Sequence, residues 1–299
     1  MIKRERYNNR MGPLFISLRP KQWTKNFLIF AGLIFSKSVF QGPLLIQSIA
    51  AFVLFCILSG AEYLVNDLVD LKQDRTHPLK KKRPLASGKL SVQLAITVSV
   101  SLFALGLAVS FLLSRSFGLI ALIYVLMMLG YTVVFKHIVI LDVIVIALGF
   151  VLRAIAGAVV IDVSISFWLL VCTISLALFL VLSKRRHELV LLGDSATDHR
   201  KILGEYSPYL LDQMISVVTA STVVFYALYT TASDTIEKFG TKNLMFTMPF
   251  VLYGIFRYLY LVHQKSLGGS PEQILIQDKP MIVNILFYLL TVGLILYHV

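Results

Sequence analysis

The hydrophobic positions of this chain form long apolar runs separated by polar connections, without the alternation of period two that is typical of strands. A bilayer core about 30 Å thick takes about 20 helical residues to cross. Because backbone groups in lipid need internal hydrogen bonds, runs of this length predict transmembrane helices. About nine candidate spans lie near residues 26–43, 44–65, 92–113, 117–135, 139–160, 166–183, 209–231, 244–262 and 281–298, and Lys37 interrupts the first.

Composition supports a membrane protein, since 57% of the 299 residues are hydrophobic, 15% are charged and the mean hydropathy is +0.79. No soluble domain, low-complexity tract or clear repeat interrupts the pattern. We therefore predict an all-α integral membrane protein. Its expected parts are a basic cytoplasmic N-terminal segment over residues 1–25 and a single transmembrane catalytic domain over residues 26–299.

The formal net charge of +12 follows from the predicted topology. With a cytoplasmic N-terminus, the N-terminal segment and the loops after spans two, four, six and eight hold 22 of the 28 Lys and Arg residues. Basic residues favour the cytoplasmic side, so we expect a multi-pass protein of the cytoplasmic membrane with its N-terminus and polar chamber facing the cytoplasm. Nucleic-acid binding is not expected, because the basic loops lack interleaved aromatic residues for base stacking.

Three carboxylates and an amide stand at the end of the second span, as Asn66, Asp67, Asp70 and Asp74. On a helix turning about 100° per residue, the three acids project within about 60° of one another and Asn66 lies about 40° further. Clustered carboxylates repel unless a cation joins them, and Mg²⁺ commonly shares oxygen ligands with phosphates. This face predicts a Mg²⁺-diphosphate site, with Asp67, Asp70 and Asp74 as catalytic metal ligands and Asn66 as a ligand of substrate phosphate.

A basic loop follows the acidic face. Arg75, Arg83 and Lys89 are candidate ligands for substrate phosphate, because turns at Pro84 and Gly88 can fold the loop over the site. Lys80, Lys81 and Lys82 are interpreted more simply as an anchor for anionic lipid head groups.

A second polar cluster reads Ser183-Lys184-Arg185-Arg186-His187-Glu188 at the end of the sixth span. Lys184 and Glu188 are four residues apart and share a helix face, whereas Arg185 points about 100° away. We predict that Lys184 and Glu188 take part in catalysis and that Arg185 binds phosphate. An ordinary positive-inside anchor is the alternative.

Two further cations are candidates for substrate phosphate. Arg153 lies within a span, where it is expected to face the bundle interior and either pair with Asp142 or Glu62 or bind phosphate. Lys136, at the end of the fourth span, is either a phosphate ligand or a snorkelling anchor.

The motif Asn66-Asp67-x-x-Asp70-x-x-x-Asp74 in a chain of about nine spans resembles the UbiA superfamily of intramembrane prenyltransferases over nearly the whole sequence. The second motif departs from the aromatic prenyltransferases of that superfamily, because it holds one carboxylate among several cations. It is similar instead to the decaprenyl-phosphate phosphoribosyltransferase branch. Segments that agree are Leu18-Arg19-Pro20-Lys21-Gln22-Trp23-Thr24-Lys25-Asn26, Asp74-Arg75-Thr76-His77-Pro78, Arg153-Ala154-Ile155-Ala156-Gly157 and Gly269-Ser270-Pro271-Glu272.

The resemblance implies a Mg²⁺-dependent transfer of phosphoribose from phosphoribosyl pyrophosphate to a polyprenyl phosphate, in a UbiA-type helix bundle, with Lys25 among the phosphate ligands. A prenyltransferase that uses prenyl diphosphate remains an alternative, because fold does not fix chemistry. A transporter or flippase has no evident need for three metal-spaced acids at one membrane face. The lipid's chain length and a homo-oligomeric state are left open.

Overall fold

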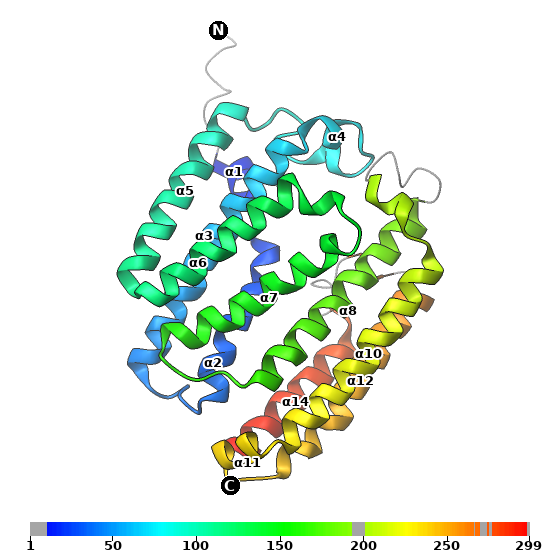
Figure 1. The fold of residues 1–299 in the computed structure, drawn as a ribbon. Helices are drawn as coiled ribbons and strands as arrows, with labels where there is room; N and C mark the ends of the chain where they lie inside the picture. Colours follow the sequence, from blue (N-terminus) through cyan, green and yellow to red (C-terminus); the bar gives the residue numbers. More distant parts are fainter. Residues whose placement is uncertain (1–10, 193–200, 266, 270–273, 275–276, 298–299) are drawn as a thin grey trace. The chain divides into compact units, whose positions relative to one another are not determined.

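The computed structural model describes the chain apart from residues 1–10, 193–200, 266, 270–273, 275–276 and 298–299. Every regular element in the part so described is helical (Figure 1), which confirms the predicted all-α class. Eight described helical segments are long and apolar enough to cross a membrane. They comprise α3 (Gly42–Val69), α5 (Val92–Leu113), α6 (Arg115–Val133), α7 (Leu141–Val160), α8 (Phe167–Leu192), α10 (Pro208–Thr231), η7 (Asn243–Thr247) with α12 (Met248–Gln264), and α14 (Lys279–Tyr297).

Contacts divide the chain into two compact units. Unit 1 comprises Met1–Lys136 and Leu152–Val163, and unit 2 comprises His137–Val151 and Ser164–Val299, so α7 contributes to both. In unit 1, α3, α5 and α6 pack on one another. In unit 2, α10 packs on α8 and α12, and α12 packs on α14. The prediction of one catalytic domain over residues 26–299 stays a prediction.

The segment predicted as the first span, residues 26–43, is organised differently from the other eight. A short α1 (Met11–Ser17) is followed by η2 (Pro20–Ile29) and α2 (Phe30–Phe35). The helical run ends before Lys37, whose φ of 58° is left-handed and breaks a right-handed helix. From Pro20 to Phe35 the run is about 29 Å long, given its 3₁₀ and α rises, which is close to the thickness of a bilayer core.

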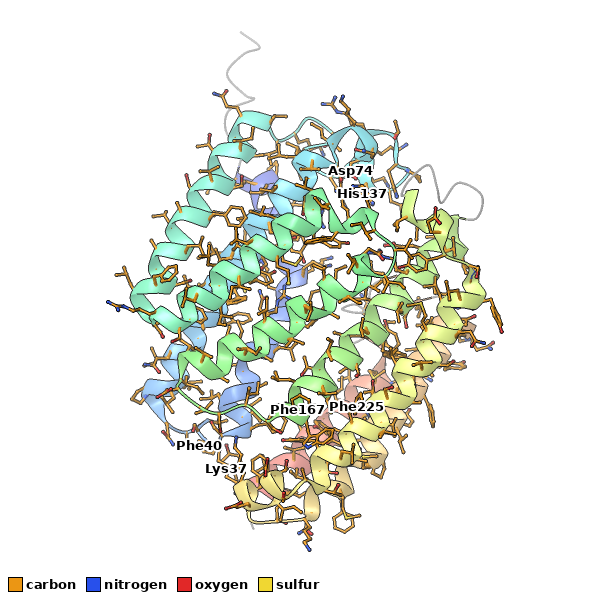
Figure 2. The ribbon with its side chains drawn as sticks, viewed as in Figure 1. Lys37, Phe40, Asp74, His137, Phe167 and Phe225 are labelled. Atoms are coloured by element: carbon orange, nitrogen blue, oxygen red, sulfur yellow. The ribbon has the colours of Figure 1, made fainter. Side chains whose placement is uncertain are left out.

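This composite run packs tightly within unit 1. A Cβ built on Gly157 of α7 would lie 1.9 Å from the Ile29 carbonyl oxygen, and one built on Gly32 would lie 2.8 Å from the Ala158 Cα. Figure 2 places Asp74 at the opposite end of unit 1 from Lys37 and Phe40. The predicted topology places Lys37 on the side of the membrane away from the cytoplasm, and this orientation stays a prediction.

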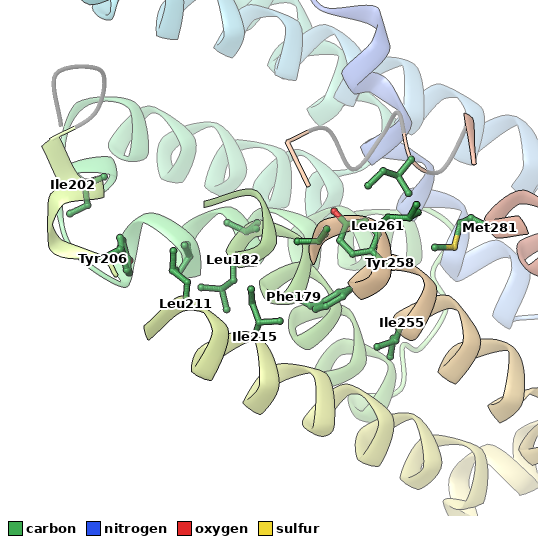
Figure 3. Packing of buried hydrophobic residues seen from close by; sticks show 14 residues of the cluster. Phe179, Leu182, Ile202, Tyr206, Leu211, Ile215, Ile255, Tyr258, Leu261 and Met281 are labelled. Carbon is green, nitrogen blue, oxygen red and sulfur yellow. The ribbon is translucent and has the colours of Figure 1, made fainter. Parts of the chain in front are cut away.

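The core of unit 2 is built from the facing apolar sides of its helices (Figure 3). Phe179 and Leu182 of α8 pack with residues of α10, α12 and α14, and Phe179 stacks edge-on against Tyr258 with ring centroids 5.1 Å apart. Ile202 and Tyr206, in and after the short η6 (Lys201–Glu205), belong to the same cluster. The loop before α10 is thereby anchored to the helical core.

Asp278 joins two helices of unit 2. Its carboxylate accepts a hydrogen bond from the Met281 backbone N–H (2.9 Å) at the start of α14, and two from Arg257 of α12 (3.1 and 2.8 Å). The Arg257 hydrogen bonds hold the pKa of Asp278 below its usual value. The carboxylate therefore stabilises the fold above the usual carboxyl pKa, and this contribution is lost as the pH falls through the lowered value.

Asp278→Ala is expected to lower the free energy of unfolding by about 1–2 kcal/mol, because both the helix cap and the ion pair are lost. Asp278→Asn keeps a capping side chain and should cost less. Thermal unfolding in detergent between pH 3 and 7 measures both, with the exposed Glu237→Gln as control. Equal effects of the Ala and Asn variants would contradict the capping role.

Candidate functional site

The acidic motif lies where α3 gives way to the short α4 (Leu71–Thr76). Asp67 is in the last turn of α3, Asp70 is the residue between the two helices, and Asp74 is in α4. The Asp74 backbone N–H donates to the Asp70 carbonyl (2.8 Å), so the chain keeps a nearly helical path through the motif. Asp67 and Asp74 are each only 2% exposed, and Asp70 is half-buried. All three acids belong to unit 1, and two of them, Asp67 and Asp74, are buried in it.

Each carboxylate of the motif has a cationic partner. Asp67 accepts hydrogen bonds from Arg19 and from Arg83 Nη1 (3.1 Å). The same Arg83 nitrogen donates to Asp74 (2.5 Å), and Lys136 Nζ donates to Asp70 (2.5 Å). Sequence reasoning expected the loop of Arg83 to fold over the acids, as it does here, whereas it did not place Lys136 beside them. The predicted contact of Arg83 and Lys136 with substrate phosphate stays a prediction.

The loop that carries Arg83 is fixed on both sides. His77 Nδ1 accepts hydrogen bonds from the backbone N–H groups of Leu79 (3.1 Å) and Lys80 (3.2 Å). Beyond Arg83, Leu85 and Leu90 are buried in a small cluster with Leu64 of α3. Burial raises the pKa of Asp74, and the adjacent Arg83 guanidinium opposes that shift. Arg83 thus offsets part of the cost of burying the Asp74 charge.

The carboxylates of Asp67, Asp70 and Asp74 differ in how well they could bind a divalent cation. In the part of the chain that the structure describes, no group of three or more His, Cys, Asp or Glu side chains is arranged to hold a metal ion. Asp67 and Asp74 nevertheless share one Arg83 nitrogen, so one oxygen of each lies within about 6 Å of the other. Both side chains approach the same guanidinium nitrogen, and carboxylate oxygens are the ligands that Mg²⁺ prefers. Asp67 and Asp74 therefore fit the cation, whereas Asp70 is turned toward Lys136.

The other candidates on this loop and helix are placed less centrally. Asn66 and Lys25 are half-buried, whereas Arg75 and Lys89 are exposed. Lys81 and Lys82 are also exposed, as an anchor for lipid head groups requires. Neither the acids nor Arg83 makes a described hydrogen bond with Arg75 or Lys89, so the loop brings one of its three predicted phosphate ligands to the motif.

Arg153 is buried in unit 1, as its position within a span required. Its Nε donates to Asn26 (2.8 Å) and its Nη2 donates to the Tyr124 hydroxyl (2.7 Å). Tyr124 is also hydrogen-bonded to Glu62, which is 5% exposed and interacts electrostatically with Arg153. Of the two acids suggested as partners, Glu62 belongs to this network. Asp142 instead accepts hydrogen bonds from Arg185 and Tyr206.

The basic cluster of α8 forms a separate network in unit 2. Arg185, 3% exposed, donates to Asp142 (2.9 Å) and to Glu188 (2.7 Å). Lys184 is half-buried, and Arg186 forms a bidentate ion pair with Asp212 of α10 (2.5 and 3.3 Å). Sequence reasoning separated Arg185 from Glu188 by helix angle, but residues three apart are also neighbours on a helix. The structure pairs them.

Among the residues of these networks that sequence reasoning did not assign to them are Arg19, Asp142 and Tyr206. Arg19 lies 48 residues before Asp67, and Tyr206 lies 64 residues after Asp142. Asp142 was considered only as a partner for Arg153. A signal was present for Arg19, since it lies in the segment of residues 18–26, which is one of those that carry the family resemblance. For Tyr206 nothing in the local sequence pointed to the contact.

The chain is similar to known membrane enzymes in sequence and in fold. The sequence matches a model described as the UbiA prenyltransferase family over residues 26–273. The decaprenyl-phosphate phosphoribosyltransferase of Corynebacterium glutamicum is 33% identical over 300 residues, covering 99% of this chain and 90% of that protein. The protein of the same name from Mycobacterium tuberculosis is 32% identical, covering 93% and 92%. A UbiA homolog from Archaeoglobus fulgidus, bound to GPP and Mg²⁺, has the same fold, with a TM-score of 0.73 over 95% of this chain and 99% of that one at 20% identity.

Proposed function

This chain belongs to the UbiA prenyltransferase family, and we propose that it transfers 5-phosphoribose from phosphoribosyl pyrophosphate to a polyprenyl phosphate. The observation that carries the proposal is the cluster of Asp67, Asp70 and Asp74 with Arg19, Arg83 and Lys136 at the end of an apolar helix. Three acids and three bases in one place suit a ligand that brings both a cation and a polyanion. The names of the relatives from C. glutamicum and M. tuberculosis support decaprenyl phosphate as the acceptor.

The reaction forms one bond and breaks one. A phosphate oxygen of the lipid attacks C1′ of the donor, and the bond from C1′ to the diphosphate oxygen breaks, with the electron pair leaving on diphosphate. A phosphate monoester has its second pKa near 6 and is largely dianionic at neutral pH, so the nucleophile needs no general base. Inversion at C1′ is expected. The main requirement is to neutralise the leaving diphosphate.

The residues of this chain divide that work. Asp67 and Asp74 would hold Mg²⁺, with Asp70 as a further ligand when it leaves Lys136. When bound, Mg²⁺ supplies charge neutralisation to the diphosphate. Arg83, Arg19 and Lys136 donate hydrogen bonds to phosphate oxygens, for which guanidinium groups are well shaped. Lys184 and Arg185 are assigned to the acceptor phosphate, with Glu188 orienting Arg185, and Arg153 is assigned to the donor.

The proposal is tested by comparing donors. The purified protein with Mg²⁺ and decaprenyl phosphate should release diphosphate from phosphoribosyl pyrophosphate, and only when the lipid is present. Geranylgeranyl diphosphate in place of the ribosyl donor should release none above background. Release from the prenyl diphosphate with an aromatic acceptor, and none from the ribosyl donor, would favour the prenyltransferase alternative. Uptake of substrate into proteoliposomes without Mg²⁺ and without diphosphate release would favour a transporter.

A further inference from the structure

Asp142, in the first turn of α7, is the most completely buried acid among the described residues of unit 2, at 0% exposure. Both of its oxygens are engaged. Oδ1 accepts from the Tyr206 hydroxyl (2.7 Å), and Oδ2 accepts from Arg185 Nε (2.9 Å). A buried carboxylate is costly without such partners. Asp142 thus links the segment before α10 to the basic cluster of α8.

The backbone beside Asp142 is strained. Ile140 has a φ of 70°, a left-handed conformation that is rare for a β-branched residue. Its carbonyl accepts the first hydrogen bonds of α7, from Val143 (3.1 Å) and Ile144 (3.0 Å). Its N–H donates to the Tyr206 hydroxyl (2.8 Å). One hydroxyl therefore holds both the strained start of α7 and the Asp142 carboxylate.

Tyr206 is itself fixed. Its ring is 5% exposed and lies in the core of unit 2, near Ile202 and Leu211 in Figure 3. Burial, together with the hydrogen bond to Asp142, raises the pKa of Tyr206 to about 12. The hydroxyl consequently stays protonated and able to donate over the physiological range.

The network ends on the group assigned to the acceptor. Arg185 is bonded on one side to Asp142 and on the other to Glu188 (2.7 Å). A guanidinium held at Nε and Nη1 has little freedom to rotate, so its direction is set before substrate binds. Preorganised donors lower the cost of binding an anion.

We propose that Tyr206 and Asp142 are positioning residues that hold Arg185 in the orientation needed to bind the phosphate group of the lipid acceptor. The hydrogen bond from the Ile140 N–H, at the strained turn, holds the Tyr206 hydroxyl in place to donate to Asp142. The assignment of Arg185 to the acceptor rests on the proposed function. In this proposal Tyr206 and Asp142 act only through Arg185, so their effect is expected on the lipid acceptor and not on the donor.

The test is equilibrium binding to the full-length protein in detergent, measured separately for radiolabelled decaprenyl phosphate and radiolabelled phosphoribosyl pyrophosphate. Tyr206→Phe should weaken binding of the lipid phosphate about tenfold, the scale of one hydrogen bond to a charged group, and leave donor binding within about twofold. Asp142→Asn should weaken lipid binding further. Tyr209→Phe, which removes a hydroxyl from an exposed ring in the first turn of α10, should change neither.

Coupling to Arg185 is tested in the double variant. In an Arg185→Gln background, adding Tyr206→Phe should weaken lipid binding by no more than about twofold, because the guanidinium that Tyr206 positions has already been removed. The proposal would be overturned if the losses of lipid affinity in the two single variants multiplied in the double variant. It would also be overturned if Tyr206→Phe weakened binding of both ligands equally, or if it bound both ligands as Tyr209→Phe does. If Tyr206→Phe does not fold, the same binding measurements on Asp142→Asn test the proposal. Intact binding of both ligands by the parent without ribosyl transfer would instead be a failure of the proposed function.

Discussion

Asp67→Asn is expected to lower the rate of ribosyl transfer by about a thousandfold or more, because it removes charge from the carboxylate at the centre of the cluster. Asp67 is the acid that contacts two guanidinium groups, those of Arg19 and Arg83. An amide in its place neither balances these charges nor binds Mg²⁺ strongly. Steady-state transfer at saturating donor and lipid measures the loss.

A loss of fold has to be separated from this loss of chemistry. The side chains of Arg19 and Arg83 are about a quarter exposed, so water compensates part of the missing charge and the free energy of unfolding should fall only modestly. Glu237→Gln, which neutralises an exposed acid, should change neither activity nor stability. An Asp67→Asn variant that folds and retains a tenth of the parent rate would remove Asp67 from the proposed site.

Gly157→Ala is expected to destabilise the protein by about 3 kcal/mol, a large effect for one methyl group. The added Cβ would lie 1.9 Å from the Ile29 carbonyl oxygen, and 2.6 Å from its carbon, so the backbone itself must move. Gly157 follows Arg153 by four residues and Ile29 follows Asn26 by three, so the movement should also disturb the Arg153 to Asn26 hydrogen bond. Thermal and denaturant unfolding in detergent measure the stability.

Gly293→Ala is the matched control for this change. Gly293 is in the helix α14, and a Cβ built there meets no atom within 4 Å. Because alanine is favoured over glycine within helices by about 1 kcal/mol, this variant should be as stable as the parent or slightly more so. Similar behaviour of the two variants would show that the contact between Gly157 and Ile29 does not constrain the fold.

The sequence predicted the parts of this structure that depend on local pattern. Eight spans appear as long helices because an apolar run of that length has one low-energy form in lipid. The run from Pro20 to Phe35 was harder to place, since its polar residues and the left-handed Lys37 depend on packing within unit 1. Hydropathy contains no information on such packing.

The same division holds for the candidate site. The clustering of Asp67, Asp70 and Asp74 followed from their spacing along a nearly helical path. Asp70 nevertheless turns toward Lys136, and the role of the three acids as metal ligands stays a prediction. The partners of those acids were only partly predictable. Arg83 is close in sequence, whereas Arg19 reaches Asp67 from the segment before η2. The hydrogen bond between Tyr206 and Asp142 is likewise a product of tertiary folding, and a single sequence gives no means of pairing residues so far apart.

The central claim is tested most directly by following radiolabel from phosphoribosyl pyrophosphate into the lipid phase. The purified parent and the Asp70→Asn variant are incubated side by side with Mg²⁺ and decaprenyl phosphate. We predict that the parent transfers label and that the variant does not, which would establish the reaction and the acidic face together. Equal transfer by the two proteins would contradict the role of the acidic face. The absence of lipid-phase label from the parent, with both substrates bound, would contradict the proposed reaction itself.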